Sequence, residues 1–191
     1  MKFPPSFPQL TTFRMVLRAL QASDAPAVWE LLRNPAAVQY YDIGIASTEK
    51  AATYIRLLEY RFGKGESLMW GMALWDDPAH LIGMVGLEQD LDHHSTARIR
   101  YVLHPNYWQQ GLMREALVAI VQFSFARLQI TRLTSLRHPE NKKAEHLLNA
   151  FGFSHFLNRK VQWLMRDRYV NLEVWQLEKS QYQNVQLESD A

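Results

Sequence analysis

Residues 107–116, Tyr-Trp-Gln-Gln-Gly-Leu-Met-Arg-Glu-Ala, follow a stretch typical of a β-strand (residues 96–103) and precede a strong helical pattern. A strand, a polar turn with one glycine and a helix start place several backbone N–H groups around one small volume. The first N–H groups of a helix have no intrahelical partner, and the helix dipole puts partial positive charge there. We therefore expect this turn to bind an anion such as phosphate or pyrophosphate. Such turns are common, so the hypothesis depends on the rest of the chain.

Composition narrows the classes of protein. The 191 residues suit one domain, and 48% apolar with 21% charged residues is a normal globular balance. A net charge of +2 is too small to indicate nucleic-acid binding, and the absence of cysteine excludes disulfides and a Cys nucleophile. Neither a signal peptide nor an apolar run long enough to span a membrane is evident. We expect a cytoplasmic protein without a metal.

Apolar periodicity and turn residues predict the elements of a mixed α+β sheet. Helices are expected over residues 23–33, 47–63 and 142–150, with another beginning after Gly111. About seven strands are expected, at residues 15–20, 68–75, 81–89, 96–103, 132–136, 153–163 and 170–177, with a turn at residues 76–78. The predicted domain covers residues 10–178, between an N-terminal extension (1–9) and a polar C-terminal tail (179–191) that we expect to be frayed.

Several short motifs occur in an order that resembles one known family. They are residues 12–18, Asp24-Ala25, Asn34-Pro35, Ile82-Gly83 with Gly86, residues 107–116, and His138-Pro139-Glu140-Asn141 followed by Ala144, Leu147 and Phe151-Gly152-Phe153. Each motif is weak alone. Together they are similar to the GNAT superfamily of N-acetyltransferases, and within it to the RimJ/RimL type, the ribosomal-protein N-terminal acetyltransferases.

The resemblance implies a GNAT acyl-CoA N-acyltransferase fold, with a mostly antiparallel sheet, flanking helices and splayed central strands. Acetyl-coenzyme A would lie between residues 96–103 and 132–136. The backbone of Val102 and Leu103 would bind pantetheine. The pyrophosphate would meet the turn N–H groups of Gln109, Gln110, Gly111, Leu112 and Met113, and Asn141 would touch the pantetheine arm or its linkage to phosphate. Arg114 opposes the dipole of its helix unless it faces an anion, so we add it to this site.

Acetyl transfer needs a neutral amine, and many members of the family use a glutamate as base and a Ser or Tyr as acid. This sequence departs from that pattern. Ala144 replaces the expected Ser and Leu148 the Tyr. Gln162 or Trp163 stands where the ribosomal group has a late Glu, and Arg98 replaces a common acidic residue. The resemblance therefore assigns no base.

Glu88 is the candidate base, because it ends a strand whose neighbours line the acceptor side of this fold. A partly desolvated carboxylate there would accept a proton directly or through water; the alternative is a solvated glutamate. Tyr101 is the candidate for a hydroxyl near the thioester, with Tyr107 as a second; both are residue types that often only pack. His138 either titrates beside the pantetheine or shapes the turn before Pro139.

Two functions follow from these residues. The first is an acetyl-CoA-dependent N-acetyltransferase in which an amine attacks the thioester directly in a ternary complex. Its acceptor would be a protein N-terminus or a small amine, and a basic segment with Arg159, Lys160, Arg166 and Arg168 favours an acidic acceptor if it is more than a solvated hairpin. The second is a catalytically degenerate acyl-CoA-binding or sensing module. Nucleic-acid and membrane partners are not expected, and the chain is a monomer or homodimer.

Overall fold

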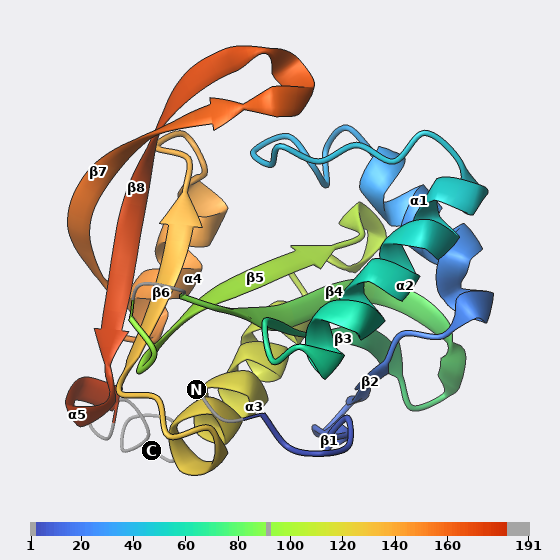
Figure 1. Ribbon diagram of the computed structural model, residues 1–191, viewed down its shortest axis with the longest axis horizontal. Helices are drawn as coiled ribbons and strands as arrows, with labels where there is room; N and C mark the ends of the chain where they lie inside the picture. Colours follow the sequence, from blue (N-terminus) through green and yellow to red (C-terminus); the bar gives the residue numbers. More distant parts are fainter. Residues whose placement is uncertain (1–2, 91–92, 183–191) are drawn as a thin grey trace.

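A computed structural model describes residues 3–90 and 93–182. Within them, one sheet of eight strands has the order β1-β2-β3-β4-β5-β6-β8-β7 (Figure 1). The strands are β1 (Leu10–Thr11), β2 (Met15–Ala19), β3 (Ser67–Leu74), β4 (Asp77–Gln89), β5 (Thr96–Leu103), β6 (Arg132–Arg137), β7 (Ser154–Trp163) and β8 (Arg168–Glu178). The helices are α1 (Ala25–Arg33), α2 (Thr48–Gly63), α3 (Leu112–Arg127), α4 (Lys142–Ala150) and α5 (Lys179–Tyr182). This α+β architecture confirms the predicted fold class.

Two apolar cores lie on opposite faces of the sheet, because alternate side chains of a strand point to opposite sides. On β3, Leu68 and Trp70 pack in the core that contains α3, whereas Met69 packs in the core formed with α1 and α2. Figure 1 shows α2 in front of the sheet and α3 behind it. The sheet between them is therefore buried on both faces, which fits the nearly continuous apolar sequence of β3 and β4.

Two glycines on β4 allow its neighbours to approach closely. A Cβ on Gly83 would lie 2.7 Å from the carbonyl oxygen of Val102, and one on Gly86 would lie 2.5 Å from that of Leu68. Real Cβ atoms do not come this close, so any side chain at these positions would push β5 or β3 away. The two glycines of the family motif thus hold the centre of the sheet together.

The elements differ from the sequence prediction at three places. β1 is an additional two-residue strand that pairs with β2, so the sheet has eight strands rather than about seven. β4 begins at Asp77 instead of residue 81, because the turn is confined to residues 75–76. Residues 179–182 form α5, where Tyr182 is buried against Phe125 (5.6 Å between ring centroids). The rest of the predicted tail lies outside the described residues.

The central strands β5 and β6 are parallel neighbours that separate along their length. They pair only at Thr96–Arg132, Ala97–Leu133 and Arg98–Thr134, after which β5 continues for five residues and β6 for three. On its other side β6 remains paired with β8 along its whole length, and β5 with β4. The sheet therefore divides into two blocks with an opening between them (Figure 1). Within the described part of the chain, no helix could cross a membrane.

Candidate functional site

A cleft of about 670 Å³ opens beside the separated ends of β5 and β6. This volume falls within the usual range of small-molecule sites, roughly 300–1,000 Å³. Its wall contains all but one of the cofactor-binding residues expected from sequence: Val102, Leu103, Gln109, Gly111, Leu112, Met113, Arg114 and Asn141. The candidate catalytic residue Tyr101 also lines it. Gln110 is absent from the lining. Residues from the loop before α2 and from α4, among them Tyr41, Lys143 and Leu147, complete it.

The turn between β5 and α3 is held in an unusual backbone conformation. Gln109 and Gly111 both have positive φ, 60° and 75°, and Gly111 is the N-cap of α3. In this conformation the helix begins abruptly, and the N–H groups of Leu112, Met113 and Arg114 stand at its N-terminus without intrahelical partners. The three residues line the cleft. A helix start that faces a cleft with free N–H groups is suited to a phosphate oxyanion.

A buttress formed by Thr12, Arg14 and Glu115 fixes this turn from behind. Glu115 accepts hydrogen bonds from the Thr12 hydroxyl (2.5 Å) and the Arg14 Nε (2.7 Å), and Arg14 Nη1 donates to the carbonyl of Gln110 (2.8 Å). Burial would raise the pKa of Glu115, but the hydrogen bonds from Thr12 and Arg14 outweigh it and lower this pKa. Gln110 thus contributes its carbonyl to the buttress, which explains why it faces away from the cleft.

The free edge of β5 offers alternating backbone groups. The N–H of His104 bonds Ile82 on β4, so in an antiparallel ladder the backbone of Val102 also faces β4. The backbone groups of Tyr101 and Leu103 then point to the opening. Their carbonyls already accept hydrogen bonds, from the Tyr41 hydroxyl (2.5 Å) and the Trp108 indole (2.8 Å) respectively. Val102 therefore lines the cleft by its side chain, and the N–H groups of Tyr101 and Leu103 are the available donors.

Asn141 caps α4, with its Oδ1 accepting from the N–H of Ala144 (3.1 Å). The loop before it is organised by Arg137, a residue that the sequence reasoning missed. Arg137 is 4% exposed and donates to the carbonyls of Pro139 (3.0 Å) and Asn141 (3.3 Å) and to the carboxylates of Glu173 and Glu145. Its position before His138 gave no signal, because an arginine at a strand end is normally a surface residue.

Positive charge also reaches the cleft from α4. Lys143 lies over the Trp108 ring, 3.8 Å from its centroid, and both residues line the cleft. A cation stacked on an indole keeps its charge available for an anion while losing little entropy on binding.

His138 has a structural role in the turn before α4. Its ring stacks on Tyr40 (5.1 Å between centroids) and accepts a hydrogen bond from the N–H of Glu140 (3.2 Å). These contacts fit the second of its two predicted roles, that of shaping the turn before Pro139.

Glu88 does not line the cleft. Its side chain is 13% exposed, and it pairs with Arg100 (3.0 Å), Arg61 (3.2 Å) and Arg98 (4.0 Å). Burial would raise its pKa, but Arg100 first, then Arg61 and Arg98, lower it below the usual value. A carboxylate held ionised in this way accepts a proton poorly. The catalytic role of Glu88 therefore stays a prediction, and the geometry favours an electrostatic role instead.

The variant Glu88→Gln tests this role. We expect kcat to fall by less than about tenfold and the acidic limb of the kcat/KM pH profile to stay in place, because loss of a general base typically costs about 10²–10⁴-fold. The measurement is the pH profile of acetyl transfer from pH 5 to 9, with Glu66→Gln, whose weak ion pair with Arg61 (3.4 Å) is exposed, as the control. Disappearance of the limb in Glu88→Gln alone would restore Glu88 as the base.

Tyr101 lies on β5, half-buried beside Tyr41. Burial, followed by the neighbouring Tyr41, raises the pKa of its hydroxyl strongly, so the group is a hydrogen-bond donor and a weak acid. Burial likewise raises the pKa of Tyr41 to about 12. The hydroxyl of Tyr41 thus lies at the edge of β5, where it donates to the carbonyl of Tyr101. Tyr107 packs against the core.

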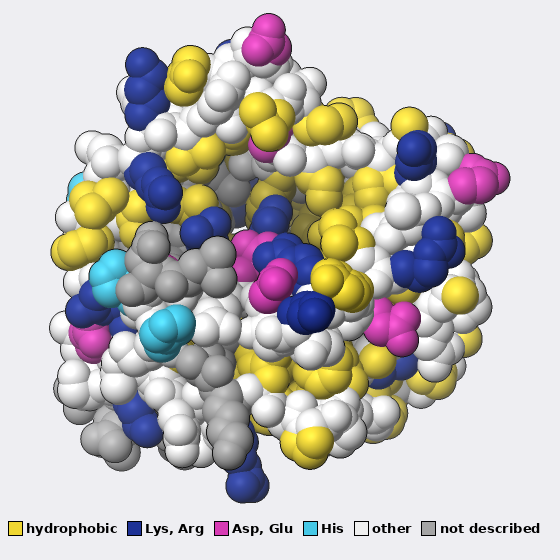
Figure 2. Space-filling model, viewed as in Figure 1, with side chains coloured by type: hydrophobic (Ala, Val, Ile, Leu, Met, Phe, Trp, Pro, Cys, Tyr) yellow, Lys and Arg dark blue, Asp and Glu magenta, His cyan; other side chains and the backbone are white. Residues whose placement is uncertain are grey.

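The loop between α1 and α2 bridges the two blocks of the sheet. The carboxylate of Asp42 accepts from the N–H groups of Leu164 (2.6 Å) and Met165 (2.9 Å) at the tip of the β7–β8 hairpin. In return Arg166 donates to the carbonyls of Val38 and Gln39, both at 3.1 Å. The loop therefore closes one side of the opening. Figure 2 shows the molecule hollowed between this hairpin and the side that carries α1, with Lys, Arg, Asp and Glu side chains gathered at the centre of the face.

Ion pairs around the cleft predict how stability depends on pH. The pKa values of Glu88, Glu115 and Glu173 are all lowered in the folded chain. A lowered folded pKa stabilises the fold above the unfolded value, which is 4.5 for these groups, and the stabilisation is lost as pH falls through the folded pKa. We expect Tm to drop as pH is lowered below about 4.5 and to drop less steeply in Glu88→Gln. Equal slopes in calorimetric scans of both proteins would contradict this.

A sheet that opens between two parallel strands, with a helix N-terminus at the opening, is the architecture of acyl-CoA-dependent N-acetyltransferases. The family model for the acetyltransferase (GNAT) domain matches residues 14–154. The chain therefore belongs to the GNAT family and is an N-acetyltransferase, which confirms the resemblance noted from sequence.

Similar proteins agree with this assignment. The uncharacterised N-acetyltransferase YoaA of Bacillus subtilis is 28% identical over 148 residues, which cover 77% of this chain and 83% of YoaA. The structure of a candidate ribosomal-protein-serine acetyltransferase from Vibrio cholerae has a TM-score of 0.78 and 25% identity, over 93% of this chain and 99% of the other. The RimL ribosomal L7/L12 alpha-N-protein acetyltransferase in complex with coenzyme A shares the fold (TM-score 0.73, 19% identity, 90% and 97% covered). The GNAT fold binds acetyl-CoA.

Proposed function

We propose that this chain transfers an acetyl group from acetyl-CoA to a primary amine, either a protein N-terminus or a small molecule, by direct attack in a ternary complex. The observation that carries the proposal is the cleft of about 670 Å³ where β5 and β6 part. It brings together the backbone N–H groups of an unpaired strand edge and of a helix N-terminus with the side-chain amide of Asn141, which are hydrogen-bond donors suited to an amide-rich, phosphate-bearing molecule.

Each part of the cleft would hold a different part of acetyl-CoA. The N–H groups of Leu112, Met113 and Arg114 suit the pyrophosphate, with the charge of Lys143 beside them. The strand edge at Leu103 suits an amide of pantetheine, as an added strand would pair. Asn141 keeps its amide N–H groups for the same arm, since only its Oδ1 caps α4.

The N–H of Tyr101 is the group best placed to polarise the thioester carbonyl, because it points from the edge of β5 into the opening between β5 and β6. In the reaction a nitrogen–carbon bond forms while the carbon–sulfur bond breaks, sulfur leaves with the electron pair, and the amine gives up one proton. The chain positions the reactants, and solvent receives the proton if no side chain does.

A second function, an acyl-CoA-binding or sensing module, is favoured by two observations: Glu88 is fixed by arginines, and Ala144 occupies the position of the usual Ser. Release of free thiol from acetyl-CoA, measured with a panel of amines, amino acids and peptides, separates the two. Thiol release that depends on an acceptor supports the transferase. Calorimetric binding of acetyl-CoA without release for any acceptor supports the module, and absence of binding contradicts both.

A further inference from the structure

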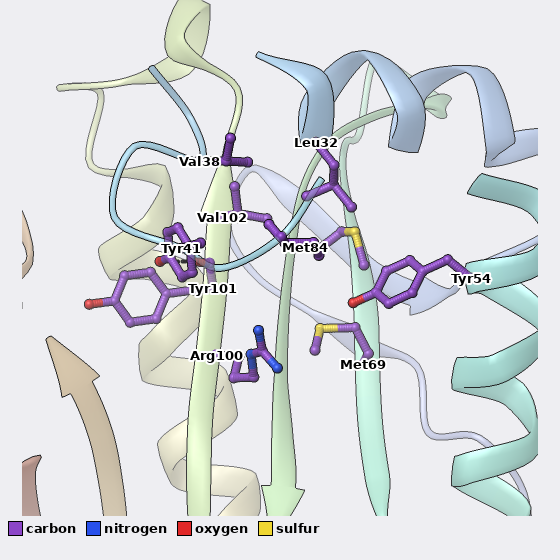
Figure 3. A pocket seen from close by; sticks show the side chains of 10 residues that line it. Leu32, Val38, Tyr41, Tyr54, Met69, Met84, Arg100, Tyr101 and Val102 are labelled. Carbon is purple, nitrogen blue, oxygen red and sulfur yellow. Dashed lines mark hydrogen bonds between the residues drawn. The ribbon is translucent and has the colours of Figure 1, made fainter. Parts of the chain in front are cut away.

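A second, smaller cavity adjoins the cleft on the other side of β5. Its volume is about 30 Å³, and it lies between β5, β4, β3 and the helices α1 and α2. Three of its lining residues, Tyr41, Tyr101 and Val102, also line the large cleft. The two spaces therefore meet at the edge of β5, where the Tyr41 hydroxyl bonds the Tyr101 carbonyl (Figure 3).

The small cavity holds one strong cation with spare hydrogen-bonding capacity. The guanidinium of Arg100 has five N–H donors, of which Nη1 donates to Glu88 (3.0 Å). In residues 3–90 and 93–182 it has no other hydrogen bond, and its side chain is 38% exposed. Figure 3 shows the guanidinium turned toward the space between Tyr101 and the thioether side chains of Met69 and Met84.

A second polar group faces the same space. The hydroxyl of Tyr54, from α2, points toward Arg100 in Figure 3, and no residue in the described part of the chain bonds it. The other walls, including Leu32, Met69 and Met84, are apolar. A guanidinium and a phenol that converge in an apolar cavity are a donor pair for an anion.

Charge around the cavity favours an anion as well. Arg61, Arg98 and Arg100 share the one carboxylate of Glu88, and the further partner of Arg61, Glu66, is 45% exposed and 3.4 Å away. The three arginines are thus only partly neutralised. A cationic acceptor with additional amines would meet this positive charge, whereas a carboxylate would complete the pairing of Arg100.

Size selects the kind of anion. About 10–15 Å³ of space open to a water-sized sphere holds one water molecule. The cavity offers about 30 Å³ of such space, so it admits a planar carboxylate and little more. We propose that the amine acceptor carries a carboxylate close to its amine, as an α-amino acid does, and that Arg100 and Tyr54 bind that carboxylate. The inference rests on the proposed transferase function. The amine would then lie at the junction of the cavities, beside the edge of β5.

The test compares L-amino acids with the corresponding amino acid amides as acceptors. For the amino acid that reacts best, we expect kcat/KM about tenfold above that of its amide, since a charge-assisted pair in a partly buried, mostly apolar cavity contributes about this factor. Arg100→Gln should remove the preference by lowering the amino-acid rate more than the amide rate, so that the ratio of the two falls to about one. Tyr54→Phe should reduce it in part.

Arg98→Gln is the matched control. It removes the same charge from the same strand and the same neighbour, Glu88, but Arg98 does not line the cavity. If Arg98→Gln keeps the preference for the amino acid over its amide, a direct contact at Arg100 is supported. If both variants lose this preference equally, the effect is one of general electrostatics and the proposal is overturned. A preference for amides, polyamines or an aminoalkylphosphonate would also overturn it.

Binding distinguishes failure of this inference from failure of the proposed function. The same amino acid and amide are titrated calorimetrically into the protein with and without coenzyme A. If no acceptor releases thiol but the amino acid still binds more tightly than the amide, and Arg100→Gln abolishes the difference, the carboxylate site stands while the transferase proposal fails. If acetyl transfer occurs and neither turnover nor binding favours the carboxylate, only the carboxylate site fails.

Discussion

Replacing Arg137 by methionine is expected to lower the free energy of unfolding by about 3 kcal/mol, because the buried guanidinium is lost and the partly buried carboxylate of Glu173 keeps only its hydrogen bond from Trp175. The side chain of Arg137 is 3% exposed, and it joins β6 to β8 through Glu173 and to α4 through Glu145. Its guanidinium also lies 5.3 Å from the Trp175 ring centroid. For a chain of this size Tm should fall by roughly 6–12 °C, at about 2–4 °C for each kcal/mol.

The same substitution should weaken binding of coenzyme A at a distance. Arg137 holds the loop before α4 by its bonds to the carbonyls of Pro139 and Asn141, so its loss frees the residue that caps α4. We expect Kd for coenzyme A to rise at least about fivefold, about 1 kcal/mol. Thermal unfolding and calorimetric titration of the same preparations measure both effects.

Arg132→Met is the control for Arg137→Met. Arg132 begins the same strand and pairs with Glu178 on β8, but its side chain is 40% exposed and it touches neither the loop nor α4. An exposed pair contributes about 0–1 kcal/mol, so Tm should change little and coenzyme A binding not at all. If Arg137→Met and Arg132→Met lower Tm equally, the burial of Arg137 does not explain its contribution to stability.

The second large effect is expected for Gly111→Val. Gly111 has φ of 75° at the N-cap of α3, a conformation that a β-branched residue strongly disfavours, and a Cβ there would lie 3.4 Å from Nη2 of Arg14. The cost is about 1–3 kcal/mol of stability if the turn is kept. If the turn instead adopts another backbone conformation, the N–H groups of Leu112 and Met113 move away from the cleft. The affinity for coenzyme A should then fall at least about tenfold, about 1.4 kcal/mol.

Gln109→Gly separates these two consequences. Gln109 also has positive φ, 60°, so glycine relieves strain there while it adds flexibility to the unfolded chain. We expect stability within about 1 kcal/mol of the original and coenzyme A affinity within about twofold. Fluorescence-monitored denaturation and calorimetry would compare the variants. Unchanged affinity in Gly111→Val would mean that this turn is not the pyrophosphate site.

Local signals in the sequence correctly predicted much of this architecture. Ser47 is the N-cap of α2, as its position before an apolar helical pattern indicated, and α3 begins after Gly111 as expected. The apolar residues of 81–89 and 96–103, together with the turn residues that bound them, predicted strands β4 and β5, and the order of motifs predicted the family. These features depend on neighbouring residues, so a single sequence contains the information.

The errors and omissions involve contacts between distant segments. Val102 was expected to offer its backbone to pantetheine, but the side on which each N–H of β5 lies depends on its register with β4. Glu88 was proposed as a partly desolvated base without its arginine partners, because nothing in the sequence places Arg61 beside it from 27 residues away. The sequence did not indicate the roles of Tyr41 and Arg137 for the same reason. Each donates a hydrogen bond to a backbone carbonyl, of Tyr101 and Pro139 respectively, that its side chain reaches only in the folded chain.

The sequence by itself therefore determined the family, the order of elements and the turn at residues 107–116 that faces the cleft, since turns and caps are set by local backbone preferences. Only the tertiary structure decided which groups of that site are available. In the folded chain the Gln110 carbonyl accepts a hydrogen bond from Arg14, and the carbonyls of Tyr101 and Leu103 accept from Tyr41 and Trp108. Glu88 pairs with three arginines. The physical reason is that hydrogen-bond partners and burial, which set a group's charge and chemistry, are contributed by residues far apart in the chain.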